Sequence, residues 1–160
     1  MRDSLFQVAV TAALAPSREE RSLLPGTNSK PADVLIPHWT HGRDTALDVT
    51  VVNPLQSALV NRAAYDTKPG HALNYAFDWK MTKHGAACRR EGLVFQPMPV
   101  ESLGGWHEQA VEQVKKIGAA LARQTGQEEG EAVGHLFQRL SVLLMRGKCS
   151  TPPQQDTILP

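Results

Sequence analysis

The amino-acid sequence predicts a small α/β domain, in which a mixed β-sheet containing a β-hairpin is flanked by helices. Two runs rich in aliphatic and β-branched residues, 33–36 and 46–52, are separated by a turn-like segment and predict the hairpin. A third apolar run, 93–100, follows a long helical segment, so a crossover brings it to the sheet. The remaining long segments have helical periodicity.

Length and composition agree with this class. The chain has 160 residues, of which 41% are hydrophobic and 21% charged, as in ordinary globular domains. We place one domain at residues 1–148 and expect the proline- and glutamine-containing tail, 149–160, to be disordered. No run approaches the ~20 apolar residues of a membrane span.

The first 30 residues predict one helix and a loop. Residues 4–15 form the helix, which Pro16 ends. The alternative, a short signal peptide, is disfavoured because Gln7 and Thr11 interrupt its apolar run. Residues 17–30 predict a loop with one helical turn around 18–23.

The other elements follow from the same signals. Pro37 closes the strand 33–36, and Asn53-Pro54 closes the strand 46–52. Pro97 and Pro99 make the strand 93–100 irregular or place it near a sheet edge. The expected helices cover residues 55–64, 71–90 (with Gly92 as the stop signal), 106–123 and 128–146.

Two aspartates lie in the predicted hairpin. If Asp33 and Asp48 pair across its strands, the turn falls near residues 40–41, where the loop must lie, and their Cβ atoms are ~5 Å apart. A carboxylate in an apolar strand is costly to bury without a cationic partner, and Mg²⁺ is bound by one or two carboxylates. The alternative is that Asp33 opens a strand at the surface and Asp48 faces solvent.

Lys80 and Lys83 are three residues apart in the predicted helix 71–90 and therefore share a helix face. That face either approaches the carboxylates or is simply solvated. Trp79 beside the lysines is expected to be a core residue rather than a stacking platform for a base. Glu101, just after the third strand, is a further candidate metal ligand, with helix capping as its alternative role.

These residues together resemble the endonuclease domain of site-specific non-LTR retrotransposons, in the PD-(D/E)XK superfamily. The resemblance rests on residues 30–33 (KPAD), 47–51 (LDVTV) and 80–84 (KMTKH). Over nearly its whole length the chain is also similar to domains that follow reverse transcriptases in invertebrate and fish retroelement proteins, including a stretch matched by Phe95 through Gly105. Three features depart from the pattern: Ala32 is inserted before Asp33, the spacing from Asp48 to Lys80 is long, and Thr50 replaces the superfamily lysine.

The resemblance implies a restriction-endonuclease-like core that hydrolyses one phosphodiester bond of DNA with Mg²⁺ or Mn²⁺. Asp33, Asp48 and the Val49 carbonyl would hold the ion. Lys83, or alternatively Lys80, would orient the attacking water. The implied partners are target DNA and a reverse transcriptase domain in cis, for which the cut provides a primer end.

Charge and cysteines add two expectations. The net charge is +1, whereas independent nucleic-acid binders are usually more basic, so DNA binding requires a local basic face or neighbouring domains. Two rival functions therefore remain: a degenerate nuclease fold that binds without cutting, and an interaction module that uses the last two helices. Two cysteines without metal spacing favour a reducing location, nuclear or cytoplasmic, over secretion. We expect no membrane partner.

Overall fold

A computed structural model describes residues 1–18, 32–55 and 70–150, with the backbone alone for 147–150. In the described residues a helix is followed by three strands, a run of helices, a fourth strand and two further helices. In order they are α1 (Arg2–Thr11), β1 (Ser17–Arg18), β2 (Val34–Thr40), β3 (Arg43–Val52), α3 (His71–Lys80), the π-helical turn η1 (Met81–Gly85), α4 (Ala86–Arg90), β4 (Val94–Glu101), α5 (Glu108–Thr125) and α6 (Glu129–Ser150).

The strands form one mixed sheet in the order β1-β2-β3-β4. β2 and β3 form the antiparallel hairpin, and β4 pairs with β3 in parallel after the crossover through α3 and α4. The predicted mixed sheet with a hairpin is therefore confirmed. β4 lies at one edge, as Pro97 and Pro99 predicted, because an edge strand needs fewer N–H donors.

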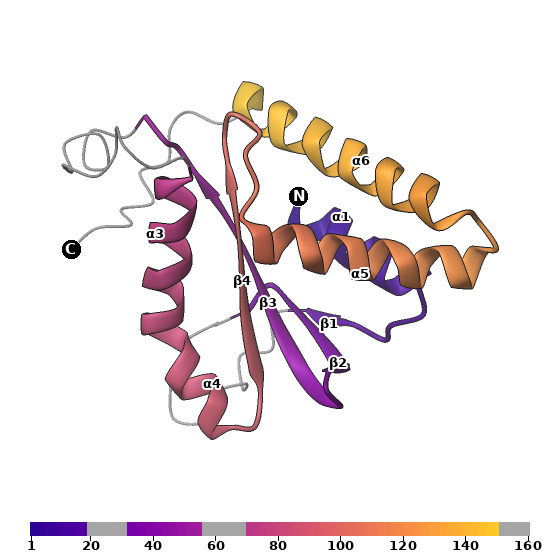
Figure 1. The fold of residues 1–160 in the computed structure, drawn as a ribbon, viewed down its shortest axis with the longest axis horizontal. Helices are drawn as coiled ribbons and strands as arrows, with labels where there is room; N and C mark the ends of the chain where they lie inside the picture. Colours follow the sequence, from indigo (N-terminus) through magenta and orange to yellow (C-terminus); the bar gives the residue numbers. More distant parts are fainter. Residues whose placement is uncertain (19–31, 56–69, 151–160) are drawn as a thin grey trace.

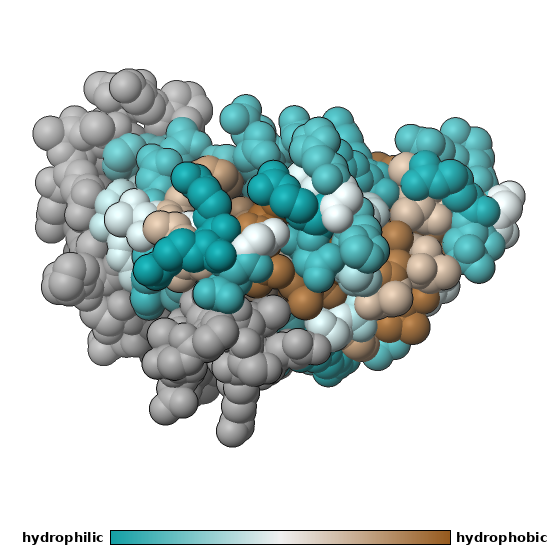
Figure 2. Space-filling view, turned by 90° about the horizontal axis from the view of Figure 1, so that it is seen from below, coloured by the Kyte–Doolittle hydropathy of each residue, from teal (hydrophilic) through white to brown (hydrophobic). Residues whose placement is uncertain are grey.

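Helices cover both faces of this sheet (Figure 1). α1, α5 and α6 cover one face, where the larger core lies, and α3 and α4 cover the other. Side chains alternate along β3, so Leu47 joins the larger core while Ala46 packs with Cys88 and Phe95 on the α4 side. Seen from below, the surface is mainly hydrophilic, with apolar side chains exposed between polar ones (Figure 2).

Several expected element boundaries are wrong. β2 continues through Pro37 to Thr40, because the register with β3 shifts between Ile36 and Thr40 and this irregularity accommodates the missing N–H. Arg18 belongs to β1, not to a helical turn, and α1 ends at Thr11. α6 reaches Ser150, which makes the first two residues of the expected tail helical.

Other expectations lie outside the described residues. These are the helix 55–64 beyond Leu55, the loop 19–30 and the tail from 151 onward. Lys30 and Pro31, two of the residues that carry the resemblance, lie there as well.

The expected helix 71–90 forms as α3, η1 and α4 in direct succession. Its stop signal is correct: Gly92 adopts a left-handed conformation (φ 74°), which glycine takes without steric cost. The π-helical turn was not predicted. Such turns are rare and occur often at functional sites.

Candidate active site

Asp33 and Asp48 lie side by side where the hairpin opens. Val34 pairs with Leu47, and the Asp33 N–H donates to the Leu47 carbonyl at 2.9 Å. Asp33 precedes the paired residues, and its side chain reaches β3 by accepting the Val49 N–H. The negative charge of Asp48 acts on Asp33, which places the two carboxylates near each other. Asp33 itself lies in the bend just before β2, so the strand begins one residue later than expected.

Asp33 is held by its neighbours on both carboxylate oxygens. Its Oδ2 accepts the Val49 N–H at 2.9 Å, and its Oδ1 lies 3.8 Å from Nη1 of Arg2. Burial raises the pKa of Asp33, and the negative charge of Asp48 acts in the same direction. A further cation bound at this position would therefore stabilise the ionised form of Asp33.

Asp48 is buried, with 7% of its surface exposed, and it is paired. Its Oδ2 lies 2.7 Å from Nζ of Lys80, and the Thr50 hydroxyl donates to the same oxygen at 3.4 Å. The carboxylate thus has the cationic partner that a charge within an apolar strand requires. The alternative in which Asp48 faces solvent is wrong.

The two lysines have different partners. Lys80, the last residue of α3, points to Asp48, whereas Lys83 is exposed and its Nζ lies 4.7 Å from the centre of the Trp79 ring. Trp79 is only half-buried and contacts both ammonium groups, with Lys80 Nζ at 5.8 Å. The two ammonium groups therefore share Trp79 as a neighbour, while Lys80 is the one of the two that pairs with Asp48.

His84 follows Lys83 and packs edge-on against Phe95, with ring centres 5.6 Å apart. Burial lowers the pKa of His84, and the charges of Lys83 and Lys80 lower it further. His84 therefore favours the neutral form beside the two lysines.

The Val49 carbonyl also faces this site. In a strand the N–H and C=O of one residue point to the same side, and the Val49 N–H points to Asp33. The carbonyl oxygen is therefore directed toward the side of β3 where β2 has ended. Asp33, Asp48 and this carbonyl are the oxygens that the resemblance implies as metal ligands.

This set of oxygens is small, but Mg²⁺ needs few ligands from the protein. Among the described residues no three His, Cys, Asp or Glu side chains gather around a common point. Mg²⁺ is commonly held by one or two carboxylates, with water and substrate phosphate completing its shell. The desolvated Asp33 beside Asp48 meets that requirement.

Glu101 is too far along the sheet to join this set. It pairs with Val52, four residues beyond Asp48 on β3, which corresponds to ~13 Å of strand. Its side chain is instead close to Gly105 in the following turn.

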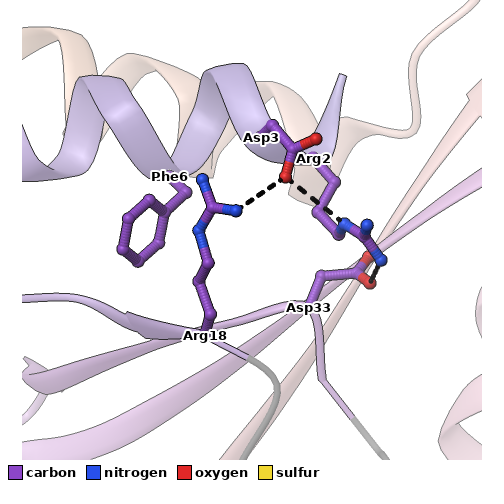
Figure 3. Close-up of a pocket in the computed structure, with 5 residues that line it drawn as sticks. All are labelled: Arg2, Asp3, Phe6, Arg18 and Asp33. Atoms are coloured by element: carbon purple, nitrogen blue, oxygen red, sulfur yellow. Dashed lines mark ion pairs between the residues drawn. The ribbon is translucent and has the colours of Figure 1, made fainter.

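A pocket that the sequence did not indicate adjoins Asp33 (Figure 3). Its volume is about 190 Å³, and Arg2, Asp3, Phe6, Arg18 and Asp33 line it. Arg18 stacks on the Phe6 ring, 4.2 Å from its centre, and pairs with Asp3 at 3.1 Å. The only local signal was the charge of residues 2 and 3, because the approach of α1 to the hairpin is a tertiary contact.

No helix in the described part of the chain is long and apolar enough to span a membrane. Comparisons with family models, curated proteins and solved structures found no match to this chain.

Proposed function

We propose that this domain is a metal-dependent DNA endonuclease that hydrolyses one phosphodiester bond with Mg²⁺ or Mn²⁺. One observation supports this most: Asp33 and Asp48 converge at the open end of the hairpin, and a helix supplies the Lys80 ammonium 2.7 Å from Asp48. Two acidic residues and a lysine around one point suit phosphodiester hydrolysis. The order helix, three strands, crossover helices, parallel strand also agrees with the restriction-endonuclease-like core that the resemblance implies.

Each residue has a distinct role in this proposal. Asp33, Asp48 and the Val49 carbonyl hold the ion. When bound there, the ion lowers the pKa of water and neutralises charge on the phosphate. Val49 fixes the orientation of Asp33 through the 2.9 Å hydrogen bond from its N–H.

Lys80 takes the catalytic role, in place of the expected Lys83. The structure holds the Lys80 ammonium beside Asp48, where it orients the attacking water and stabilises charge that builds on the phosphate oxygens. The water gives up a proton to solvent as its oxygen bonds to phosphorus, the bond from phosphorus to the 3′ oxygen breaks, and that oxygen takes up a proton from solvent. Lys83, exposed over Trp79, binds a flanking phosphate.

The cut leaves a 3′ hydroxyl, which is the group that a polymerase extends. In a retroelement protein that hydroxyl would prime reverse transcription by a polymerase domain in cis. The described residues contain no helix that resembles a base-reading element, so we assign target choice to other domains.

A metal-dependent nicking assay tests the proposal. Supercoiled DNA is incubated with the wild type, Asp33→Asn and Asp48→Asn in Mg²⁺ or Mn²⁺. Each substitution is expected to abolish cutting, and the double variant should lose no more than either single one, because both carboxylates serve one ion. Asp78→Asn, on the exposed side of α3, is the matched control. Cutting at the wild-type rate by either site variant would remove that aspartate from the site.

The lysine roles are tested separately. Lys80→Ala should reduce the single-turnover cutting rate far more than DNA affinity, because a catalytic group acts at the transition state. Lys83→Ala should weaken binding and reduce the salt dependence by about one unit of slope. If Lys83→Ala instead lost cutting rate and Lys80→Ala lost affinity, Lys83 would be the catalytic lysine, as first expected from the sequence. Wild-type rates and slopes in both variants would contradict any role for the pair.

A second candidate function is nucleic-acid binding without cutting. The ion pair between Lys80 and Asp48 favours it, because it neutralises one metal ligand, as does Thr50 at the position of the superfamily lysine. DNA binding without cleavage in either metal would select this degenerate form. If the chain neither bound nor cut DNA, the remaining function would be a protein-interaction module that uses the last two helices.

A further inference from the structure

The three tryptophans of this chain are used differently by the fold. Trp39 and Trp106 are half-buried and pack against the larger core. The Trp39 indole N–H donates to Oε1 of Gln113 at 2.7 Å, and the Trp106 ring meets Phe137 edge-on. Trp79 is half-buried as well, but within the described part of the chain it packs against none of the hydrophobic clusters. Core packing therefore does not account for this indole.

The neighbours of the Trp79 ring are cations instead. Nζ of Lys83 lies 4.7 Å from the ring centre and Nζ of Lys80 lies 5.8 Å from it, both within the range of a cation–π contact. Lys80 also pairs with Asp48, whereas Lys83 is exposed. The ammonium group of Lys83 can therefore meet a phosphate that approaches the ring from solvent.

Trp79 lies beside the candidate active site. The Lys80 ammonium that faces the ring is 2.7 Å from Oδ2 of Asp48, so one lysine side chain spans the distance from the carboxylate to the indole. α3, which ends at Lys80, covers the face of the sheet on which Asp48 lies (Figure 1). A nucleotide next to a phosphate bound at Asp48 therefore comes within reach of the ring.

A partly exposed aromatic ring with a lysine beside it suits a nucleotide. Every nucleobase has a flat face that stacks on aromatic side chains, and its phosphate binds lysine. Stacking of a base on an aromatic ring is stronger than a cation–π contact at an exposed site, so a base can displace Lys83 from the ring toward the phosphate. A paired base within a duplex is already stacked between its neighbours, so the ring selects an unpaired base.

We propose that Trp79 stacks on an unpaired nucleobase of the DNA beside the scissile bond, while Lys83 contacts a phosphate of the same nucleotide. The identity of the strand as DNA rests on the proposed nuclease function. The role of Trp79 then differs from the core position expected from its sequence context. The preferred substrate has a melted or single-stranded stretch next to the cut.

The test is DNA binding by the whole chain without divalent metal, so that binding is measured apart from cutting. A short fluorescent single strand is titrated with the wild type, Trp79→Leu and Trp79→Phe. Trp79→Leu should bind about tenfold more weakly, the change that corresponds to the loss of one stacked base. Trp79→Phe retains a ring and should bind nearly as tightly as the wild type.

Two control ligands and a salt series separate stacking from charge. An abasic strand of the same length has the same phosphates without bases, and a duplex of the same sequence has its bases paired. Trp79→Leu should bind both controls as the wild type does and should keep the wild-type salt slope, because it removes no charge. Lys83→Ala should instead lower the slope on a single strand by ~0.7, with or without bases.

The wild type alone can overturn this inference. If it binds the normal and abasic strands equally, or binds neither, Trp79 is not a stacking site. Equal binding of the single strand by the wild type and Trp79→Leu, or equal losses on all three ligands, would overturn it as well. Tighter binding of an RNA strand of the same sequence would contradict DNA as the ligand.

The same measurements distinguish this inference from the proposed function. Base-dependent binding that requires Trp79, in a chain that never cuts DNA, would support the stacking site and contradict the nuclease. Metal-dependent cutting by a chain whose binding does not depend on Trp79 would support the nuclease and contradict the stacking site.

Discussion

The two faces of the sheet are packed in different ways. On the face covered by α1, α5 and α6, the buried side chains are almost entirely aliphatic and belong to one cluster that includes Leu47 and Met98. On the face covered by α3 and α4 the clusters are smaller, and a buried carboxylate, Asp48, is held there by a lysine. Neighbouring residues of one strand, Leu47 and Asp48, thus belong to opposite kinds of packing.

We infer from this difference that one face mainly stabilises the fold and the other holds the groups that could carry out chemistry. The aliphatic face can hold β3 in place by burial alone, whose free energy scales with apolar area. The polar face depends on a few charge contacts, which a metal ion or phosphate can rearrange. We therefore expect substitutions on the two faces to differ in size and in sign.

The largest effect is expected at Leu47, which is fully buried on the aliphatic face. Leu47→Ala removes packed methyl groups and leaves a cavity, so the free energy of unfolding should fall by about 2–5 kcal/mol. Val51→Ala, on the same strand and face but 49% exposed, is the control and should change stability by about 0.5 kcal/mol or less. Urea denaturation measures both. A similar loss in the two variants would contradict the location of the main core.

A smaller loss is expected from breaking the pair on the polar face. Asp48→Asn leaves the Lys80 ammonium, whose side chain is 19% exposed, without a carboxylate. We expect destabilisation of about 1–3 kcal/mol, below the ~3–5 kcal/mol of a fully buried pair.

A double-mutant cycle isolates the pair. Adding Lys80→Gln to Asp48→Asn should restore part of the lost stability, because no uncompensated charge then remains. Additive losses would show that the 2.7 Å contact contributes little and that Asp48 is held by other interactions.

Sequence reasoning located the carboxylates because the hairpin depends on local signals. Two β-rich runs and a turn between them determine which residues pair, so the pairing of Val34 with Leu47, next to the two aspartates, follows from counting. Edge placement of β4 follows equally from the missing N–H groups of Pro97 and Pro99.

The same reasoning could not assign the lysines. A helical pattern over residues 71–90 is continuous in sequence, and nothing in it marks the π-helical turn from Met81 to Gly85. Which lysine pairs with Asp48 is a tertiary contact: Lys80 does so, whereas Lys83 lies over Trp79. Arg2 was missed for a related reason, since helix packing across a long sequence separation brings it to Asp33.

A pH-dependent effect is expected where α3 and α5 meet. The buried His107 stacks on Phe77 with ring centres 4.4 Å apart, and its Nδ1 accepts the Gln109 N–H at the start of α5. Burial lowers the pKa of His107, so the fold prefers neutral histidine. The unfolded chain binds the proton near pH 6.5, and stability should therefore fall as the pH drops from 6.5 toward the lower pKa of the folded state.

His107→Asn tests this dependence, because asparagine retains the helix cap without a titratable ring. The variant should lose about 1 kcal/mol of stacking at neutral pH and show a flatter decline of stability in acid. Parallel wild-type and His107→Asn profiles would contradict the lowered pKa of His107, because the ring would then bind its proton equally well in the folded and unfolded chain.

The smallest effect, and one of opposite sign, is expected at Asp33. Burial and the Asp48 charge raise its pKa in the fold, so the ionised carboxylate costs stability at neutral pH. Asp33→Asn keeps an oxygen that can accept the Val49 N–H and loses only the 3.8 Å contact with the half-exposed Arg2, a type of pair that contributes little. The metal-free variant should therefore be slightly more stable than the wild type at pH 7.

The sign of the pH dependence checks the cause of this gain. A raised pKa means that the wild type regains stability as the pH falls through the folded value toward 3.8, because the fold then binds the proton more tightly than the unfolded chain. The advantage of Asp33→Asn should shrink over that range. Thermal melts of both proteins at neutral and acidic pH measure the difference, in which the titration of all other groups cancels. Destabilisation of Asp33→Asn at both pH values would identify Asp33 as a structural hydrogen-bond acceptor. The two carboxylates would then stabilise the fold, and the comparison between the faces would no longer support a cation site on the polar face.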